Sequence, residues 1–264
     1  MTSTCYYGEV RYFGIATCAV VLAVTSRASA DPQTDRAAAQ QASPTPSDGR
    51  DTLLNVSAAV PAAGTLRAIA NGGGDRNGPS YGAGMLWSVG AGFAAEAGMS
   101  GTLDGAAPAA AIRWQALSQE RAGVDALAVI RYGSFSAESP GVSGGSIAGE
   151  LALARAFGRF RLTLDGMIAR GLVDRDDVDA RFGASALVAI NRRWTTGLEA
   201  RAQTEVQDDY DTPEDHGRSF DLIAGAIGAV RFGPAYVQLL AGWRSPRGLA
   251  AAGPAGLAQL TFDF

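Results

Sequence analysis

Charged side chains stand at every second position within several apolar segments, and they are the residues of this sequence whose types and spacing could do chemistry. Glu199 and Arg201 are two positions apart, so in an extended chain both point to one side and each can reach a neighbouring strand. We expect such charges to pair and stabilise an interior; alternatively, they line a thin polar passage in which arginines favour anions. The candidate residues are Arg113, Asp125, Arg131, Glu150, Arg161, Asp165, Arg181, Glu199, Arg201, Asp221 and Gln238.

Two acidic segments, 171–179 and 205–218, concentrate carboxylates that could bind divalent cations such as Ca²⁺. Neither segment has the ligand spacing of an EF-hand loop, and solvated loops commonly have this composition. The segments support an alternative function, the binding of a cation, of lipopolysaccharide or of a cell partner at the surface. Their acidic residues are Asp174, Asp176, Asp177, Asp179, Glu205, Asp208, Asp209, Asp211, Glu214 and Asp215.

His216 is the only histidine of the sequence, and it lies beside Asp215 with Asp208 nearby. A histidine and a carboxylate could provide general acid–base catalysis in a membrane-embedded hydrolase. Adjacent residues of an extended chain point to opposite sides, however, so this pair is poorly arranged to act together. We therefore predict that the protein is not an enzyme and keep the hydrolase as a third hypothesis. No residue pattern indicates a cofactor.

Apolar and polar residues alternate over about ten residues at a time through most of the chain. Within 159–170, phenylalanine and leucine occupy one side and charged residues the other. The pattern of 123–134 is blurred, because Leu127 and Val129 share the side of the charged residues. A period of two predicts β-strands rather than helices. The predicted strands are 85–97, 108–119, 123–134, 145–156, 159–170, 179–191, 194–205, 219–232, 235–244 and 255–264.

Three features favour a membrane barrel over a soluble sandwich, whose strands would also alternate. Charged residues occupy strand centres, which a hydrated barrel lumen tolerates and a sandwich interior does not. Aromatic residues gather near strand ends, as in the interfacial girdles of such barrels. Connections also alternate in length, the short ones being 156–159, 191–193 and 232–234 and the long ones 134–146, 171–179, 205–218 and 244–254. We predict an all-β, antiparallel up-and-down transmembrane β-barrel of about ten strands, or twelve if 52–84 adds a pair.

The N-terminal residues have the pattern of a secretory signal peptide. The apolar run 12–24 is followed by Ala28 and Ala30, which form an A-x-A cleavage site. Both cysteines lie within this segment, so the exported chain would form no disulfide. We divide the chain into a signal peptide (1–30), a disordered periplasmic linker (31–50), an ambiguous stretch that is linker or an extra strand pair (51–84) and the barrel (85–264).

Composition excludes several classes of protein. The formal net charge is −4, which gives no support to nucleic-acid binding. A hydrophobic content of 47% argues against a disordered chain. The longest apolar run is too short for a transmembrane helix.

The C-terminal residues Leu260, Phe262 and Phe264 alternate with polar residues and end on an aromatic side chain. This pattern resembles the terminal signal of bacterial outer-membrane β-barrels, and 123–190 resembles uncharacterised outer-membrane proteins of proteobacteria. The resemblance implies the cell outer membrane of a Gram-negative bacterium, contact with its lipid and lipopolysaccharide, and recognition of the last strand by the barrel-assembly machinery. We predict a structural or narrow-pore, porin-like barrel with a charge-paired lumen.

Overall fold

The computed structural model describes residues 50–76, 78–102, 105–133, 145–172, 178–207, 220–246 and 252–264. The predicted signal peptide, with Ala28 and Ala30, lies outside these residues. So do His216 and, apart from Asp179 and Glu205, the acidic residues of the two predicted cation-binding segments.

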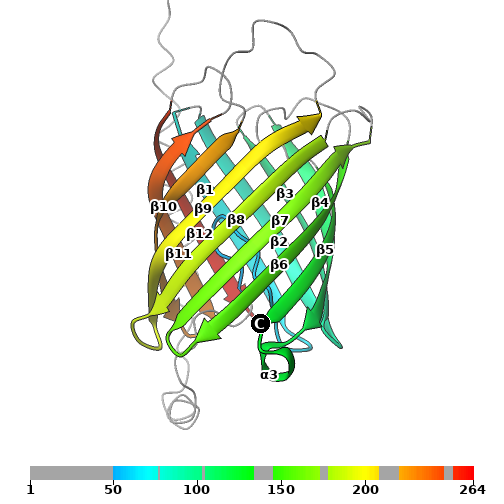
Figure 1. The fold of residues 1–264 in the computed structure, drawn as a ribbon, viewed down its shortest axis with the longest axis vertical. Helices are drawn as coiled ribbons and strands as arrows, with labels where there is room; N and C mark the ends of the chain where they lie inside the picture. Colours follow the sequence, from blue (N-terminus) through cyan, green and yellow to red (C-terminus); the bar gives the residue numbers. More distant parts are fainter. Residues whose placement is uncertain are drawn as a thin grey trace, which may run out of the picture. The chain divides into compact units, whose positions relative to one another are not determined.

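Within the described residues the chain forms one closed antiparallel barrel of twelve strands (Figure 1). Each strand pairs with its neighbours in sequence, and the first pairs with the last. The strands are β1 (Leu66–Asp75), β2 (Gly78–Gly90), β3 (Phe93–Thr102), β4 (Gly105–Leu117), β5 (Asp125–Gly133), β6 (Ser146–Phe157), β7 (Phe160–Gly171), β8 (Val178–Ala189), β9 (Trp194–Gln207), β10 (Asp221–Phe232), β11 (Ala235–Ser245) and β12 (Gly253–Asp263). A one-turn helix, α3 (Gln119–Ala122), lies between β4 and β5.

The alternative count of twelve strands is confirmed, and the count of ten is corrected. The predicted strand 85–97 contains the end of β2, the β2–β3 turn and the start of β3. β1 escaped detection because Gly72, Gly73 and Gly74 interrupt its alternation. Glycine is required there, since a Cβ at Gly73 would overlap the carbonyl oxygen of Gly256 on β12.

The outer surface of the barrel is apolar. Its most exposed large residues alternate with buried ones along most of the strands, as a surface facing lipid requires. Among the described residues, no helix is long and apolar enough to cross a membrane. Exposed apolar side chains include Ile112, Ile130, Leu151, Leu164, Ile168, Phe182, Leu198 and Leu239.

The two ends of the barrel differ. At one end, which we call the turn end, short connections join β2 to β3, β6 to β7, β8 to β9 and β10 to β11. Gly158 and Gly233 take positive φ in two of these turns. The chain also ends there, where the Phe264 backbone N–H donates to the Leu66 carbonyl oxygen at 2.8 Å. Figure 1 shows this end at the bottom, marked by the C-terminus.

Residues 50–61, which we call the inner loop, lie inside the barrel and form no strand (Figure 1). Leu54 packs against Ile223 and Leu240 on one wall. Val56 and Ala58 pack on another wall against an apolar cluster that contains Leu127 and Val129. Leu127 and Val129, which interrupt the alternation of β5, therefore point inward and cover the inner loop.

Candidate functional site: the barrel lumen and its inner loop

The inner loop enters and leaves the lumen at the turn end. Arg50 pairs with Asp263 near the end of β12, and Arg67 on β1 donates to the same carboxylate at 2.6 Å. At the other end of the loop, the Ser88 hydroxyl donates to the Pro61 carbonyl oxygen at 2.8 Å. The loop therefore crosses part of the lumen and returns, without passing through to the opposite end.

Asp51 anchors the loop to the wall. Both Arg113 guanidinium NH2 groups donate to the Asp51 carboxylate, at 2.8 and 2.7 Å, and Arg113 Nε donates to Glu96 at 3.0 Å. Gln238, on the opposite wall, donates to the Asp51 carbonyl oxygen at 3.0 Å. Burial opposes ionisation of the Asp51 carboxyl, yet Arg113 and the Ser57 backbone N–H outweigh it and hold the pKa of Asp51 below its ordinary value.

The tip of the loop is a tight turn, in which the Thr52 backbone N–H donates to the Asn55 carbonyl oxygen at 3.0 Å. Asn55 Nδ2 donates to the Ala184 carbonyl oxygen of β8 at 3.0 Å. The Asn55 side chain lies over Gly183, where an added Cβ would overlap Asn55 Oδ1. The lack of a side chain at Gly183 on β8 therefore leaves the space that the tip of the loop occupies.

The candidate lumen residues are placed on the inner face, where they are buried or half-buried and alternate with the exposed apolar residues. Most of them form ion pairs. Each of the following ion pairs contains at least one residue that the sequence proposed. They are Arg113 with Glu96 and Asp51, Arg131 with Glu96 (3.5 Å) and Glu150 (3.6 Å), Arg161 with Asp125 (3.6 Å), Arg181 with Glu150, and Asp221 with Arg244 (2.6 Å).

Several charged lumen residues were missed by the sequence reasoning. Arg244 bridges Asp221 and Asp75, at 2.6 Å to each. It was missed because it falls at the end of its strand, where a loop was expected. Glu96 lay in the segment whose turn was not recognised. Asp51, Asp263 and Arg67 were not among the proposed lumen residues, although Asp263 lies on the polar side of the last strand.

Arg201 differs from the other arginines of the lumen. Within the part of the chain that the structure describes, no carboxylate lies within ion-pair distance of its guanidinium. Its side chain is half-buried, and it interacts electrostatically with Arg181 and Arg244 as well as with Asp221 and Asp165. Three arginines thus share one side of the lumen, and one of them lacks a bonded counter-charge.

A cavity of about 210 Å³ lies beside the walls formed by β1 to β5. Its polar lining includes Asn71, Glu96, Ser100 and Arg131, which lie on the inner side of their strands. The inner loop therefore fills the lumen only in part, and small solutes retain space next to charged groups.

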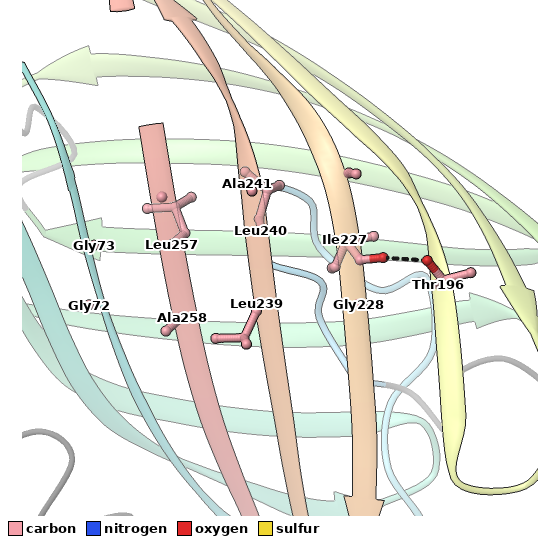
Figure 2. A pocket seen from close by; sticks show the side chains of 12 residues that line it. Gly72, Gly73, Thr196, Ile227, Gly228, Leu239, Leu240, Ala241, Leu257 and Ala258 are labelled. Atoms are coloured by element: carbon pink, nitrogen blue, oxygen red, sulfur yellow. Dashed lines mark hydrogen bonds between the residues drawn. The ribbon is translucent and has the colours of Figure 1, made fainter. Parts of the chain in front are cut away.

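A second depression, of about 570 Å³, lies on the outside of the wall (Figure 2). Its lining is small and apolar, with Gly72, Gly228 and Ala258 among the residues, and Leu239 is 59% exposed where its neighbour Leu240 is 3% exposed. Thr196 closes it on one side and donates to the Ile227 carbonyl oxygen at 2.9 Å. Apart from Thr196, the side chains that line it are apolar or absent.

Among the described residues, no group of three or more His, Cys, Asp and Glu side chains could hold a metal. Phe262 and Phe264 pack together with ring centroids 4.8 Å apart at the end of β12. Recognition of Leu260, Phe262 and Phe264 by the assembly machinery stays a prediction.

No known family model matches this sequence, and no curated protein matches it. Solved structures share its fold. The NanC porin aligns with a TM-score of 0.57 at 12% identity, over 75% of this chain and 100% of the porin. An outer membrane channel from Pseudomonas putida F1 aligns with a TM-score of 0.55 at 11% identity, over 78% and 97%.

The KdgM porin (TM-score 0.52, 7% identity, 75% of this chain and 99% of the porin) and LpxR from Salmonella typhimurium (0.51, 8%, 75% and 100%) have the same architecture. Identities this low show the fold and nothing of substrate or activity. The predicted fold, an antiparallel up-and-down β-barrel, is confirmed, and it is the fold of these porins and of this outer membrane channel.

Proposed function

We propose that this protein is a channel of the bacterial outer membrane, with a narrow lumen that favours small anionic solutes and that the inner loop restricts. A closed barrel with an apolar outside satisfies its backbone hydrogen bonds and is stable in lipid. Its inside carries the opposite pattern, with charged side chains, a cavity and a non-covalently held loop. Paired charges would also suit a structural barrel, but the free space beside charged groups favours a channel.

The observation that carries the anion preference is Arg201. Its guanidinium has no bonded carboxylate in the described residues, although Asp221 and Asp165 interact with it electrostatically, as do Arg181 and Arg244. Positive side chains lining a pore raise the local concentration of anions and lower their barrier to entry. The other lumen arginines are neutralised by ion pairs and contribute less.

The inner loop defines the closed state of the proposed channel. It occupies the lumen near the turn end and is held by the Asp51–Arg113 pair, by Asn55 over Gly183 and by two apolar clusters. Because the arrangement depends on side-chain contacts alone, the loop can be displaced while the barrel remains closed. Conduction through this end would require such a displacement.

The test is ion conduction through the purified protein in a planar lipid bilayer under a KCl gradient. We expect small or rare openings for the wild type and steady openings when residues 52–60 are replaced by a glycine–serine sequence of equal length. The reversal potential should indicate anion preference. Arg201→Ala should lower the anion-to-cation permeability ratio by about twofold or more.

Arg155→Ala is the matched control, because Arg155 is exposed beside Phe157 on the outer face. It should leave the permeability ratio unchanged. A folded barrel that carries no current, with the inner loop either intact or replaced, would contradict the proposal and favour a structural role.

A further inference from the structure

Four exposed arginines lie on two neighbouring turns at the turn end of the barrel. Arg155 and Arg159 lie at the β6–β7 turn, and Arg192 and Arg193 lie in the β8–β9 turn. The two turns are side by side at the bottom of Figure 1, where the Ala189 backbone N–H donates to the Arg159 carbonyl oxygen at 2.9 Å. We call these four arginines the basic patch.

The basic patch has no neighbouring carboxylates that could neutralise it. Within the described residues, none of its four guanidinium groups forms an ion pair, whereas most arginines of the lumen do. The segments 151–164 and 184–198, which contain both turns, hold no aspartate or glutamate. A cluster of unneutralised positive charge on a chain of formal net charge −4 indicates an anionic partner.

The position of Arg155 indicates where that partner lies. Arg155 is exposed on the outer side of β6, in line with the lipid-facing Leu151 and Leu153. Its guanidinium lies over the Phe157 ring, 4.9 Å from the centroid, and Phe157 is two residues nearer the turn. The charge is therefore directed toward the turn end and away from the bilayer centre, where an arginine is costly.

Exposed aromatic side chains lie beside the basic patch. Phe157 and Phe160 face each other across the β6–β7 turn, and Trp194 begins β9. Aromatic rings at the strand ends of a membrane barrel lie at the level of the lipid head groups. The arginines next to these rings are therefore within reach of the head groups.

We propose that the basic patch binds the head group of an anionic phospholipid in the leaflet at the turn end. A guanidinium binds a phosphate through two parallel hydrogen bonds, and several arginines near an anionic lipid surface add their attractions. A zwitterionic phospholipid has the same phosphate, but its ammonium group offsets the charge. The patch should therefore prefer a lipid of net negative charge.

A lipid fits this surface better than a soluble acidic protein does. Arg155 and Phe157 lie on the outer side of the barrel in continuity with exposed leucines, where acyl chains and head groups have access and a protein dissolved in water does not. The patch lies outside the lumen, so its test does not depend on ion conduction.

The preference should be confined to one side of the barrel. On β4, Trp114 stacks on Phe93 with ring centroids 6.1 Å apart, and the neighbouring helix α3 carries Glu120 beside Arg121. Charges of both signs offset each other there. Trp194 and Trp114 can therefore report on a basic and a balanced part of the same barrel end.

The experiment measures how brominated phospholipids quench the fluorescence of Trp194 in lipid vesicles. The purified protein has four tryptophans, so the other three are replaced in the variants Trp87→Phe, Trp114→Phe and Trp243→Phe combined. Quenching by brominated phosphatidylglycerol and by brominated phosphatidylcholine gives the relative association constant of the two lipids. We expect phosphatidylglycerol to be favoured by about threefold or more at low salt, and by less at high salt.

Substitution of the basic patch should abolish this preference. The combined changes are Arg155→Gln, Arg159→Gln, Arg192→Gln and Arg193→Gln, and lysine at the same four positions should retain most of the preference. Arg170→Gln is the matched control, because Arg170 is exposed on the outer side of β7 at the opposite end. It should leave the relative association constant at Trp194 unchanged.

A second measurement uses Trp114 as the remaining tryptophan, and we expect no lipid preference there. Equal association of both lipids at Trp194, a preference that persists in the glutamine variant, or an equal preference at Trp114 would overturn the proposal. A heat-modified gel shift verifies folding. If a tryptophan variant does not fold, native mass spectrometry compares the two lipids bound to the protein with all its tryptophans, with and without the glutamine changes, and equal retention would likewise overturn it.

Discussion

Asp51 and Arg113 form a two-bond ion pair across the barrel interior, with the carboxylate on the inner loop and the guanidinium on β4. Arg113 is almost fully buried, so removal of Asp51 leaves its charge with Glu96 as the remaining partner. We expect Asp51→Ala to lower the free energy of unfolding by about 3 kcal/mol and to increase channel opening, because loss of one partner of a buried pair is strongly destabilising.

Urea unfolding followed by tryptophan fluorescence gives the stability, and bilayer recording gives the opening. The double variant Asp51→Ala/Arg113→Ala should be less destabilised than the sum of the two single variants. Additive effects would mean that the two side chains do not interact in the folded protein.

The contact between the tip of the inner loop and Gly183 can be tested by substitution. Alanine at this position would overlap Asn55 Oδ1, so Gly183→Ala should push the loop tip off β8 and cost about 1–3 kcal/mol of stability. Limited proteolysis should then cut the loop faster. The additional change Asn55→Ala should restore part of the stability, because it removes the overlap with Asn55 Oδ1 and leaves the overlap with Asp165 Oδ2.

Gly149→Ala is the control, because Gly149 lies on β6, two strands away from Gly183, with open space around its Cβ position. Its proteolysis pattern should match that of the wild type. If Gly183→Ala and Gly149→Ala have the same stability and the same proteolysis pattern, the tip of the loop does not lie against Gly183.

The Asp51–Arg113 pair should also produce a pH dependence. The folded-state pKa of Asp51 is lower than the unfolded value of about 3.9, so the stabilisation is fully present above about pH 5. It is lost as the pH falls through the lower folded-state pKa. The stability difference between wild type and Asp51→Asn should be constant from about pH 5 to 7 and shrink below about pH 4. A difference that already shrinks near neutral pH would show that another group is responsible.

Substitution of Phe264 can distinguish an effect on assembly in cells from an effect on the stability of the folded barrel. Its side chain is 69% exposed, whereas its backbone N–H bonds to Leu66. If the final strand presents the assembly signal that the sequence predicts, Phe264→Ala should refold in detergent as well as the wild type but insert into the outer membrane of cells several-fold less. Deletion of Phe264 should be at least as severe. Phe160→Ala, an exposed aromatic elsewhere, serves as the control, and equal insertion of all variants would count against the signal.

The sequence predicted the barrel because most of its strands separate an apolar side from a polar one over their whole length. The sequence did not predict β1, because Gly72, Gly73 and Gly74 have no side chains to mark an apolar and a polar side. It also did not predict the β2–β3 turn, because this tight turn interrupts no apolar run. Charged pairs such as Arg161 with Asp125 follow from strand order and alternation. Alternation cannot reveal a partner that arrives from outside the sheet.

The inner loop is that partner. Its sequence, which is rich in small and apolar residues, has neither helical nor strand periodicity, so nothing local indicates that it is buried. Only Leu127 and Val129 indicate indirectly that a segment lies buried against β5. Apolar side chains on the polar side of a strand require an apolar cover, and Val56 and Ala58 provide it.

The return of the inner loop to the turn end has a consequence for topology. Because Arg50 and Pro61 both lie at that end, residues 50–61 turn back within the lumen and do not thread through the ring of strands. The loop can dock after the ring has closed, and it can be withdrawn again without unthreading. Its docking and release are therefore reversible local steps that leave the seam between β1 and β12 intact.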